Sequence, residues 1–339
     1  MNKLILISLS IFLLQGCFLK ENPISSSMKD DSFLDEILKN KENHELQIIY
    51  TEIKRDKEGE PDFIDFEFQV DENNYFYPAS SIKLPIVILT LDKINELRSE
   101  GINVSLKSKI TLSPLDQEMS LTQKDSITSF QNLIADIFLV SDNSASNVLI
   151  DFVGYNHFNT KMNQAGFNKT YLNHKFSPDP YYTIDWEIKT MLNDRISSNE
   201  DRDIVTADDN TLGLKKGEKK FKDGIVEFGS LDFSQKNRSS IMDMHNIIKR
   251  IIFPSKFDDD NAFNLNVEDY DFLRYWMSRF TYEDLGNKFT TDKKYFESYN
   301  KFFIHGVDTV VTNKNIRVYN KIGQAYGTSV DNAYIRNYQ

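Results

Sequence analysis

The chain has 339 residues, of which 40% are hydrophobic and 13% aromatic, a composition typical of globular proteins and not of disordered ones. Lysine and arginine number 40 against 51 aspartate and glutamate residues, so the net charge is −11. Such a surface repels phosphate backbones, and no basic stripe is dense enough to offset that repulsion. The composition therefore argues against nucleic acid as a partner.

The N-terminal segment predicts export. Lys3 precedes an apolar run over 4–14, which is short for a membrane span but typical of a signal peptide. The run ends in Leu-Gln-Gly-Cys, similar to the lipobox of bacterial lipoproteins, in which the cysteine receives a diacylglycerol and the chain is cut before it. Cys17 is the only cysteine, so no disulfide is expected. We expect a signal peptide over 1–16 and a lipid-anchored protein of the bacterial cell envelope, facing the periplasm or the exterior. The alternative is a plain secretory signal with a chance cysteine.

The next segments predict a tether and then a hairpin. Residues 17–42 combine a proline, a serine run and several charges, which is typical of a linker. Segments 44–53 and 63–70 are rich in β-forming residues, and the second alternates apolar and acidic residues. A charged turn separates them. An antiparallel strand pair is therefore expected here.

The rest of the chain predicts a single domain over 43–339 with mixed helices and strands. Its sheet is expected from 43–70 and 306–339, with strands at 316–323 and 330–336. A mainly helical lobe spans about 100–300, with a polar insertion at about 193–237 that contains a short hairpin near 224–228. Helices are expected at the following ranges: 80–98, 127–140, 144–153, 156–165, 238–253 and 266–280. The predicted fold class is α+β, an antiparallel sheet flanked by helices plus a helical lobe.

A Ser-x-x-Lys tetrad opens the first of these helices. Residues three apart share a helix face, so the Ser80 hydroxyl and the Lys83 ammonium are expected close together. Lysine deprotonates a serine when desolvation or a nearby cation lowers its pKa. The alternative is an ordinary helix start.

The same spacing recurs at Ser26 with Lys29 and at Ser298 with Lys301. Neither of these tetrads lies between a predicted strand pair and an apolar helix. Context therefore favours Ser80.

A second motif, Ser141-Asp142-Asn143, follows one predicted helix and opens another. With the tetrad sixty-one residues earlier, it resembles the second motif of class A β-lactamases and penicillin-binding proteins. The alternative is a simple helix cap, since all three residue types favour helix starts.

The third motif of that family is Lys-Thr-Gly or Lys-Ser-Gly on a strand. This chain has Lys321-Ile322-Gly323 after an alternating strand, which is similar in position but lacks the central hydroxyl. A structural lysine at the strand end is the alternative.

The resemblance implies a role for each matching residue. Ser80 attacks the carbonyl, Lys83 accepts its proton, and Ser141 with Lys321 passes a proton to the departing nitrogen. Asn143 binds the acyl side chain. Gly323 lets the substrate approach, and the N–H groups of Ser80 and Gln324 form the oxyanion hole.

The chain departs from this family at two further places. The stretch 168–177, where the family has a deacylating glutamate, contains no carboxylate. His174 in that stretch, or Asp179 or Glu187 beyond it, are the candidate replacements. The family's C-terminal helix has no counterpart, so we expect either a truncated chain or other segments covering the sheet.

The resemblance therefore implies a serine acyl-transfer hydrolase acting on β-lactam or cell-wall-peptide-like amides. We expect no metal, no organic cofactor and a monomer held at the membrane by its N-terminal lipid. The alternative is a surface lipoprotein that binds penicillin or peptidoglycan without hydrolysing it.

Overall fold

The computed structural model describes residues 22–28, 32–114, 126–177, 182–186, 214–222, 224–257, 263–284, 286 and 288–339. The expected signal peptide, Cys17, Asp179, Glu187 and the first part of the polar insertion lie outside these residues. The chain divides into two compact units, Met1–Val70 and Asp71–Gln339. Within the described residues, no helix is both long and apolar enough to cross a membrane.

The first unit contains two short helices and the predicted hairpin. Helices α1 (Pro23–Met28) and α2 (Ser32–Lys39) form in the segment expected to be a tether. Strand β1 (Ile48–Arg55) pairs antiparallel with β2 (Pro61–Phe68), which confirms the predicted hairpin. That these strands join one sheet with the C-terminal strands stays a prediction.

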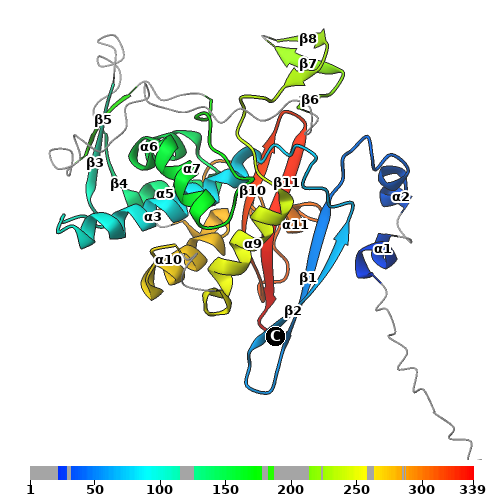
Figure 1. The fold of residues 1–339 in the computed structure, drawn as a ribbon, viewed down its shortest axis with the longest axis horizontal. Coiled ribbons are helices and arrows are strands. Elements are labelled where there is room, and N and C mark those ends of the chain that lie inside the picture. Colours follow the sequence, from blue (N-terminus) through cyan, green and yellow to red (C-terminus); the bar gives the residue numbers. More distant parts are fainter. Residues whose placement is uncertain are drawn as a thin grey trace, which may run out of the picture. The chain divides into compact units, whose positions relative to one another are not determined.

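The second unit is built around helix α3 (Lys83–Ser99), which follows a short 3-10 turn, η1 (Ala79–Ile82). The sequence predicts one apolar stripe on this helix, but every residue from Lys83 to Ile94 is buried. A helix that is packed by protein on all sides has no solvent-facing side, so a single apolar stripe does not describe it. Figure 1 shows α3 among the neighbouring helices. Those are α5 (Phe130–Val140), α6 (Asn143–Val153) and α7 (Tyr155–Gln164).

A small sheet in this lobe was not predicted. Strand β3 (Lys109–Pro114) lies between β4 (Ser126–Ser129) and β5 (Tyr182–Trp186). The predicted helix over 127–140 was therefore wrong in its first turn. The Ser129 hydroxyl accepts a hydrogen bond from the backbone N–H of Asn132, so it caps α5 and ends β4 at the same residue.

The C-terminal strands form the hairpin that the sequence predicts. Strand β10 (Ile316–Ala325) pairs antiparallel with β11 (Thr328–Asn337). Helices α9 (Ile241–Ile252) and α10 (Val267–Met277) pack against this pair (Figure 1). Strand β10 also lies beside η1. The architecture is α+β, as predicted.

The described part of the polar insertion forms two further strand pairs. β6 (Lys215–Lys216) pairs with β9 (Leu231–Asp232), and β7 (Lys219–Lys222) pairs with β8 (Ile225–Phe228). The predicted short hairpin is confirmed by the second pair. The remaining short elements are the 3-10 turns Pro254–Lys256 and Thr281–Glu283 and the helix α11 (Phe302–His305).

Candidate active site

Ser80 lies in the turn before α3 and not in the α-helix itself, which begins at Lys83. The preceding residue, Ala79, has φ +48°, a left-handed conformation that is uncommon for a residue with a side chain. Ser81 fixes this turn, because both its N–H and its hydroxyl donate to the Pro78 carbonyl at 3.0 and 2.6 Å. The Ser80 side chain is half-buried, so solvent reaches this turn.

Strand β10 approaches this turn closely at Gly323. A Cβ added there would lie 2.5 Å from the Pro78 carbonyl oxygen and 3.0 Å from the Ser80 backbone nitrogen. Only glycine fits such an approach. Gly323 is therefore required by the packing of the strand against the turn that carries Ser80.

The pairing of β10 also orients Gln324. The two-residue turn Tyr326–Gly327, with both φ values positive, makes Ala325 and Thr328 the hydrogen-bonded closing pair. Because hydrogen-bonded and non-bonded pairs alternate, the Gln324 N–H points away from β11. Among the described strands β10 pairs with β11 alone, so that N–H lies on the edge of β10 away from β11.

Ser141, Asp142 and Asn143 form the junction between α5 and α6. Ser141 ends α5 in a left-handed conformation, φ 58°. Asp142 caps α6, accepting a hydrogen bond from the Ala145 N–H at 2.7 Å. The capping interpretation thus holds for Asp142, whereas Ser141 and Asn143 make contacts across the site.

Lys83 reaches this junction. Its ammonium donates to the Ser141 carbonyl at 2.6 Å and to the Asn143 side-chain oxygen at 2.6 Å, and it lies 3.4 Å from the Ser141 hydroxyl. From the other side, the Lys321 ammonium lies 2.9 Å from the same hydroxyl. Two lysines therefore share one serine oxygen.

Both lysines are buried, and burial lowers their pKa. The pKa of Lys83 falls well below its usual value, because of desolvation first and the nearby Lys321 charge second. Desolvation lowers the pKa of Lys321 to about 7, although the Asp331 carboxylate acts in the opposite direction. Neutral amine is therefore available at this site near neutral pH.

The structure uses the Asn143 amide on both sides. Its oxygen accepts from Lys83, and its nitrogen donates to the Ser177 carbonyl at 2.7 Å. The amide is therefore held at both ends, while its second N–H and the second lone pair of its oxygen remain available to a substrate.

In the stretch 168–177, which has no carboxylate, the ring of Phe176 packs against Lys83. The Lys83 ammonium is 4.5 Å from the centre of the Phe176 ring. Two hydrogen bonds of 2.8 Å between Asn147 and the backbone of Phe176 hold that residue in place. His174, the candidate base, has its ring against Tyr77 and its Nδ1 2.7 Å from the Lys175 carbonyl. Sequence reasoning did not find the role of Phe176, because no local pattern marks a ring packed on a distant amine.

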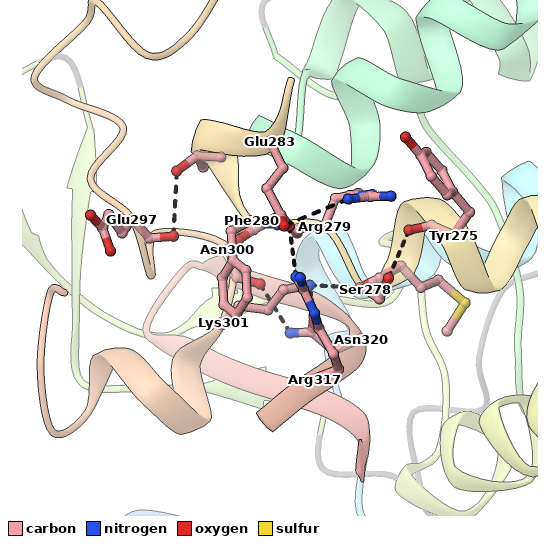
Figure 2. A network of polar contacts seen from close by, with 12 residues as sticks. Tyr275, Ser278, Arg279, Phe280, Glu283, Glu297, Asn300, Lys301, Arg317 and Asn320 are labelled. Carbon is pink, nitrogen blue, oxygen red and sulfur yellow. Dashed lines mark hydrogen bonds and ion pairs between the residues drawn. The ribbon is translucent and has the colours of Figure 1, made fainter. Parts of the chain in front are cut away.

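A buried polar network supports β10 on its other side. Lys301 donates to the Met277 carbonyl and to the Asn320 side chain at 2.6 and 2.7 Å, and Asn320 donates to the Asp331 carboxylate at 2.7 Å. Burial lowers the pKa of Lys301 to about 7. Figure 2 shows Lys301 and Asn320 beside the Glu283–Arg317 ion pair. The network holds Asn320, the neighbour of Lys321, in a fixed place.

One group in the described chain has the composition of a metal site, although the sequence predicts none. Asp92, Glu96 and His157 bring one ligand atom each within 4.8 Å of one another. The Lys161 ammonium contacts both carboxylates, at 3.2 Å from Asp92, and supplies the positive charge there. This group fits a salt bridge between α3 and α7.

Comparisons with known structures return class A β-lactamases at low identity. An enzyme from Mycobacterium abscessus matches with 15% identity and a TM-score of 0.46, covering 89% of this chain and 83% of that one. A β-lactamase from Sphaerobacter thermophilus DSM 20745 matches with 14% identity and a TM-score of 0.45, covering 86% and 78%. Family membership does not rest on likenesses at this level. A search of curated proteins finds no match.

The family profile gives the decisive comparison. The profile described as "Beta-lactamase enzyme family" matches residues 31–339, which is most of the chain. The match includes the Ser80 turn, the Ser141–Asn143 junction and strand β10 with Lys321. The chain belongs to the beta-lactamase enzyme family.

Proposed function

We propose that this protein forms a covalent acyl-enzyme on Ser80 from β-lactam or cell-wall-peptide-like amides. One observation carries the proposal: the Ser141 hydroxyl lies within reach of both buried lysines, Lys83 and Lys321. Two amines on one hydroxyl form a path along which a proton can pass. Acyl transfer from an amide needs such a path between the nucleophile and the leaving nitrogen.

The reaction balances with these groups alone. Neutral Lys83 takes the Ser80 proton as the serine oxygen bonds to the substrate carbonyl carbon. Ser141 delivers its hydroxyl proton to the nitrogen as the carbon–nitrogen bond breaks and takes one from protonated Lys83, which becomes neutral again, while the Lys321 charge stabilises the Ser141 oxygen. The backbone N–H groups of Ser80 and Gln324 are proposed to hold the carbonyl oxygen, and one such donor contributes about 3–4 kcal/mol to lowering the barrier.

The substrate class follows from the charge of the site. Lys321 favours a substrate with a carboxylate, which β-lactams and cell-wall peptides both carry. Ile322, whose side chain is buried, offers no hydroxyl to that carboxylate. We therefore expect weaker carboxylate binding than a threonine or serine at this position would give.

A second candidate, an acylating protein without efficient turnover, is favoured by Phe176. Its ring faces the Lys83 ammonium, which among the described residues donates to carbonyl, amide and hydroxyl oxygens and to no carboxylate. Hydrolysis of the ester needs a base that activates water. With an apolar ring in that place, the acyl-enzyme is expected to persist, as in a penicillin-binding protein.

The location is proposed from the N-terminal sequence alone. A lipid on Cys17 would hold the protein, as a monomer, on a membrane of the cell envelope. Membrane fractionation of cells expressing the wild type and Cys17→Ser tests this, with mass spectrometry of the N-terminal peptide. Unchanged membrane retention in the variant, with an unmodified cysteine in the wild type, would contradict it.

Labelling with a fluorescent penicillin, followed by intact-protein mass spectrometry, tests the acylation. The expected result is a mass increase of one penicillin on Ser80, lost in Ser80→Ala. Ser298→Ala, in the other described tetrad, is the matched control and should still label. Labelling that survives in Ser80→Ala would place the nucleophile elsewhere. A slow release of label would support the non-hydrolysing candidate, and a rapid release would support a hydrolase.

A further inference from the structure

The β7–β8 hairpin has an apolar face that the rest of the described chain leaves exposed. Lys219 pairs with Phe228, and Phe221 pairs with Val226. Paired residues of antiparallel strands share a face, and alternate residues along a strand do too, so these four lie together. Phe221, Val226 and Phe228 are 75%, 58% and 83% exposed. Figure 1 shows the hairpin projecting from its unit beyond β6.

The hairpin is also locally basic in an acidic protein. The segment 214–228 has five lysines against three acidic residues, whereas the whole chain has a net charge of −11. On the face opposite the apolar one, Lys220 pairs with Glu227 at 3.6 Å. On the apolar face, the Lys219 ammonium lies 5.2 Å from the centre of the Phe228 ring. Positive charge therefore borders the exposed aromatic side chains.

We propose that this hairpin docks on an anionic lipid bilayer. Aromatic and aliphatic side chains bordered by lysines are the pattern of segments that enter the boundary between headgroups and acyl chains. Anionic lipid attracts the lysines, while the three apolar side chains leave water. A protein partner fits less well, because a stable interface buries about 1,200–2,000 Å² and two four-residue strands offer far less.

The base of the hairpin connects this surface to the Ser80 turn. Leu214 and Phe233, which flank it in sequence, form one buried cluster with Tyr75, Tyr77 and Ala79. Docking would therefore hold the segment leading into Ser80 close to a lipid surface. The inference rests on the hairpin and stands whether or not Ser80 is acylated.

Fluorescence with brominated lipids tests the contact locally. Phe228→Trp is made in the full chain carrying Cys17→Ser, and vesicles contain phosphatidylglycerol and brominated phosphatidylcholine. Emission of the unsubstituted chain, with its native Trp186 and Trp276, is subtracted. The added tryptophan is expected to shift to shorter wavelength and to be quenched. Val307→Trp, at a position 91% exposed on a loop away from the hairpin, is the matched control and should show neither effect.

Charge variants in the same background test the role of the lysines. Lys215→Gln with Lys219→Gln should weaken the quenching titration about 25-fold, since one lysine near an anionic surface contributes about fivefold. Lys107→Gln with Lys109→Gln, which removes the same charge from exposed positions elsewhere, should leave it unchanged.

Three results would overturn the proposal. Equal quenching of Phe228→Trp and Val307→Trp would show that the hairpin does not enter lipid. Equal binding to vesicles of phosphatidylcholine alone would remove the role of charge. A concentration-dependent shift in emission without vesicles would show that a second copy of the chain covers the apolar face instead.

Discussion

Two Ser-x-x-Lys tetrads in the described chain both bury their lysine, but the groups that contact the lysine differ. Lys83 and Lys301 are both buried, and burial lowers the pKa of each. Lys301 donates to the Met277 carbonyl and to the side chain of Asn320 and lies 5.9 Å from the centre of the Phe280 ring. Its serine, Ser298, is fully buried and donates to the Asp308 carbonyl. Lys83 lies instead beside a second hydroxyl and a second amine.

The difference teaches that neither the spacing nor a perturbed pKa identifies a catalytic lysine. Both features follow from burying an amine, and a structural lysine is buried as readily as a catalytic one. The two tetrads differ in whether solvent reaches the serine and in whether the lysine contacts a second hydroxyl. Ser80 is partly exposed and its lysine connects to Ser141, whereas the Ser298 hydroxyl is enclosed and bonded to the backbone.

The largest effect is expected when the lysine of each tetrad, Lys83 or Lys301, is replaced by methionine. Lys83→Met should slow penicillin acylation by about 10²–10⁴-fold, because it removes the proton acceptor. Lys301→Met should leave the acylation rate within a few-fold and change stability alone. Stopped-flow labelling measures the first effect and urea unfolding the second. Equal losses of acylation in both variants would contradict the distinction.

Phe176→Glu is expected to act next most strongly, on release of the acyl group. A carboxylate beside Lys83 can activate water, so hydrolysis of the acyl-enzyme should accelerate about a hundredfold. Release of bound fluorescent penicillin measures the rate. Phe176→Leu, which keeps the apolar side chain without a carboxylate, is the control and should release at the wild-type rate. Faster release in both variants would mean that loss of the ring alone admits water.

The pH dependence of acylation sharpens the roles of the two active-site lysines. In the proposed mechanism Lys83 acts as a neutral base, so the rate should fall as acid protonates it. Lys321 has to be charged, so the rate should also fall as pH rises through about 7, the pKa of Lys321. In Lys321→Arg the guanidinium stays charged, and the alkaline limb should move upward by at least about one pH unit. An unmoved alkaline limb would assign that titration to another group.

The smallest expected effect is on stability. Lys301 binds a proton up to about pH 10.5 when unfolded but only to about pH 7 when folded, so the unfolded state holds the extra proton between these values. Stability therefore rises with pH across about 7.5–9.5. Lys301→Met should reduce that slope by up to about 1.4 kcal/mol per pH unit. Urea unfolding at several pH values measures it, and an unchanged slope would mean that Lys301 stays charged in the fold.

Local patterns were enough to find the long helices of the second unit, the three predicted hairpins and the three motif segments, but not the short helices α1, α2 and α11. The apolar run after Ser80, the cap at Asp142 and the turn at Tyr326–Gly327 are all set by neighbours in sequence. The ends of elements were predicted less accurately, as at α5, where the predicted helix began at 127 but β4 continues as far as Ser129. The β4–β3–β5 sheet was missed because β5 pairs with β3 across a long stretch of chain, as in the Ile110–Trp186 pair, and because β4 has only four residues and runs directly into α5.

What the sequence determined by itself is the chemistry that the site has available: a serine and a lysine on one helical turn, a polar junction and a lysine before a glycine. Only the tertiary structure decided that Lys83 and Lys321 meet at Ser141, that Phe176 faces Lys83, and that the second tetrad is enclosed. The physical reason is that burial and contacts between distant parts of the chain set the protonation state of a lysine and the groups that it contacts. The spacing of residues along the chain determines neither.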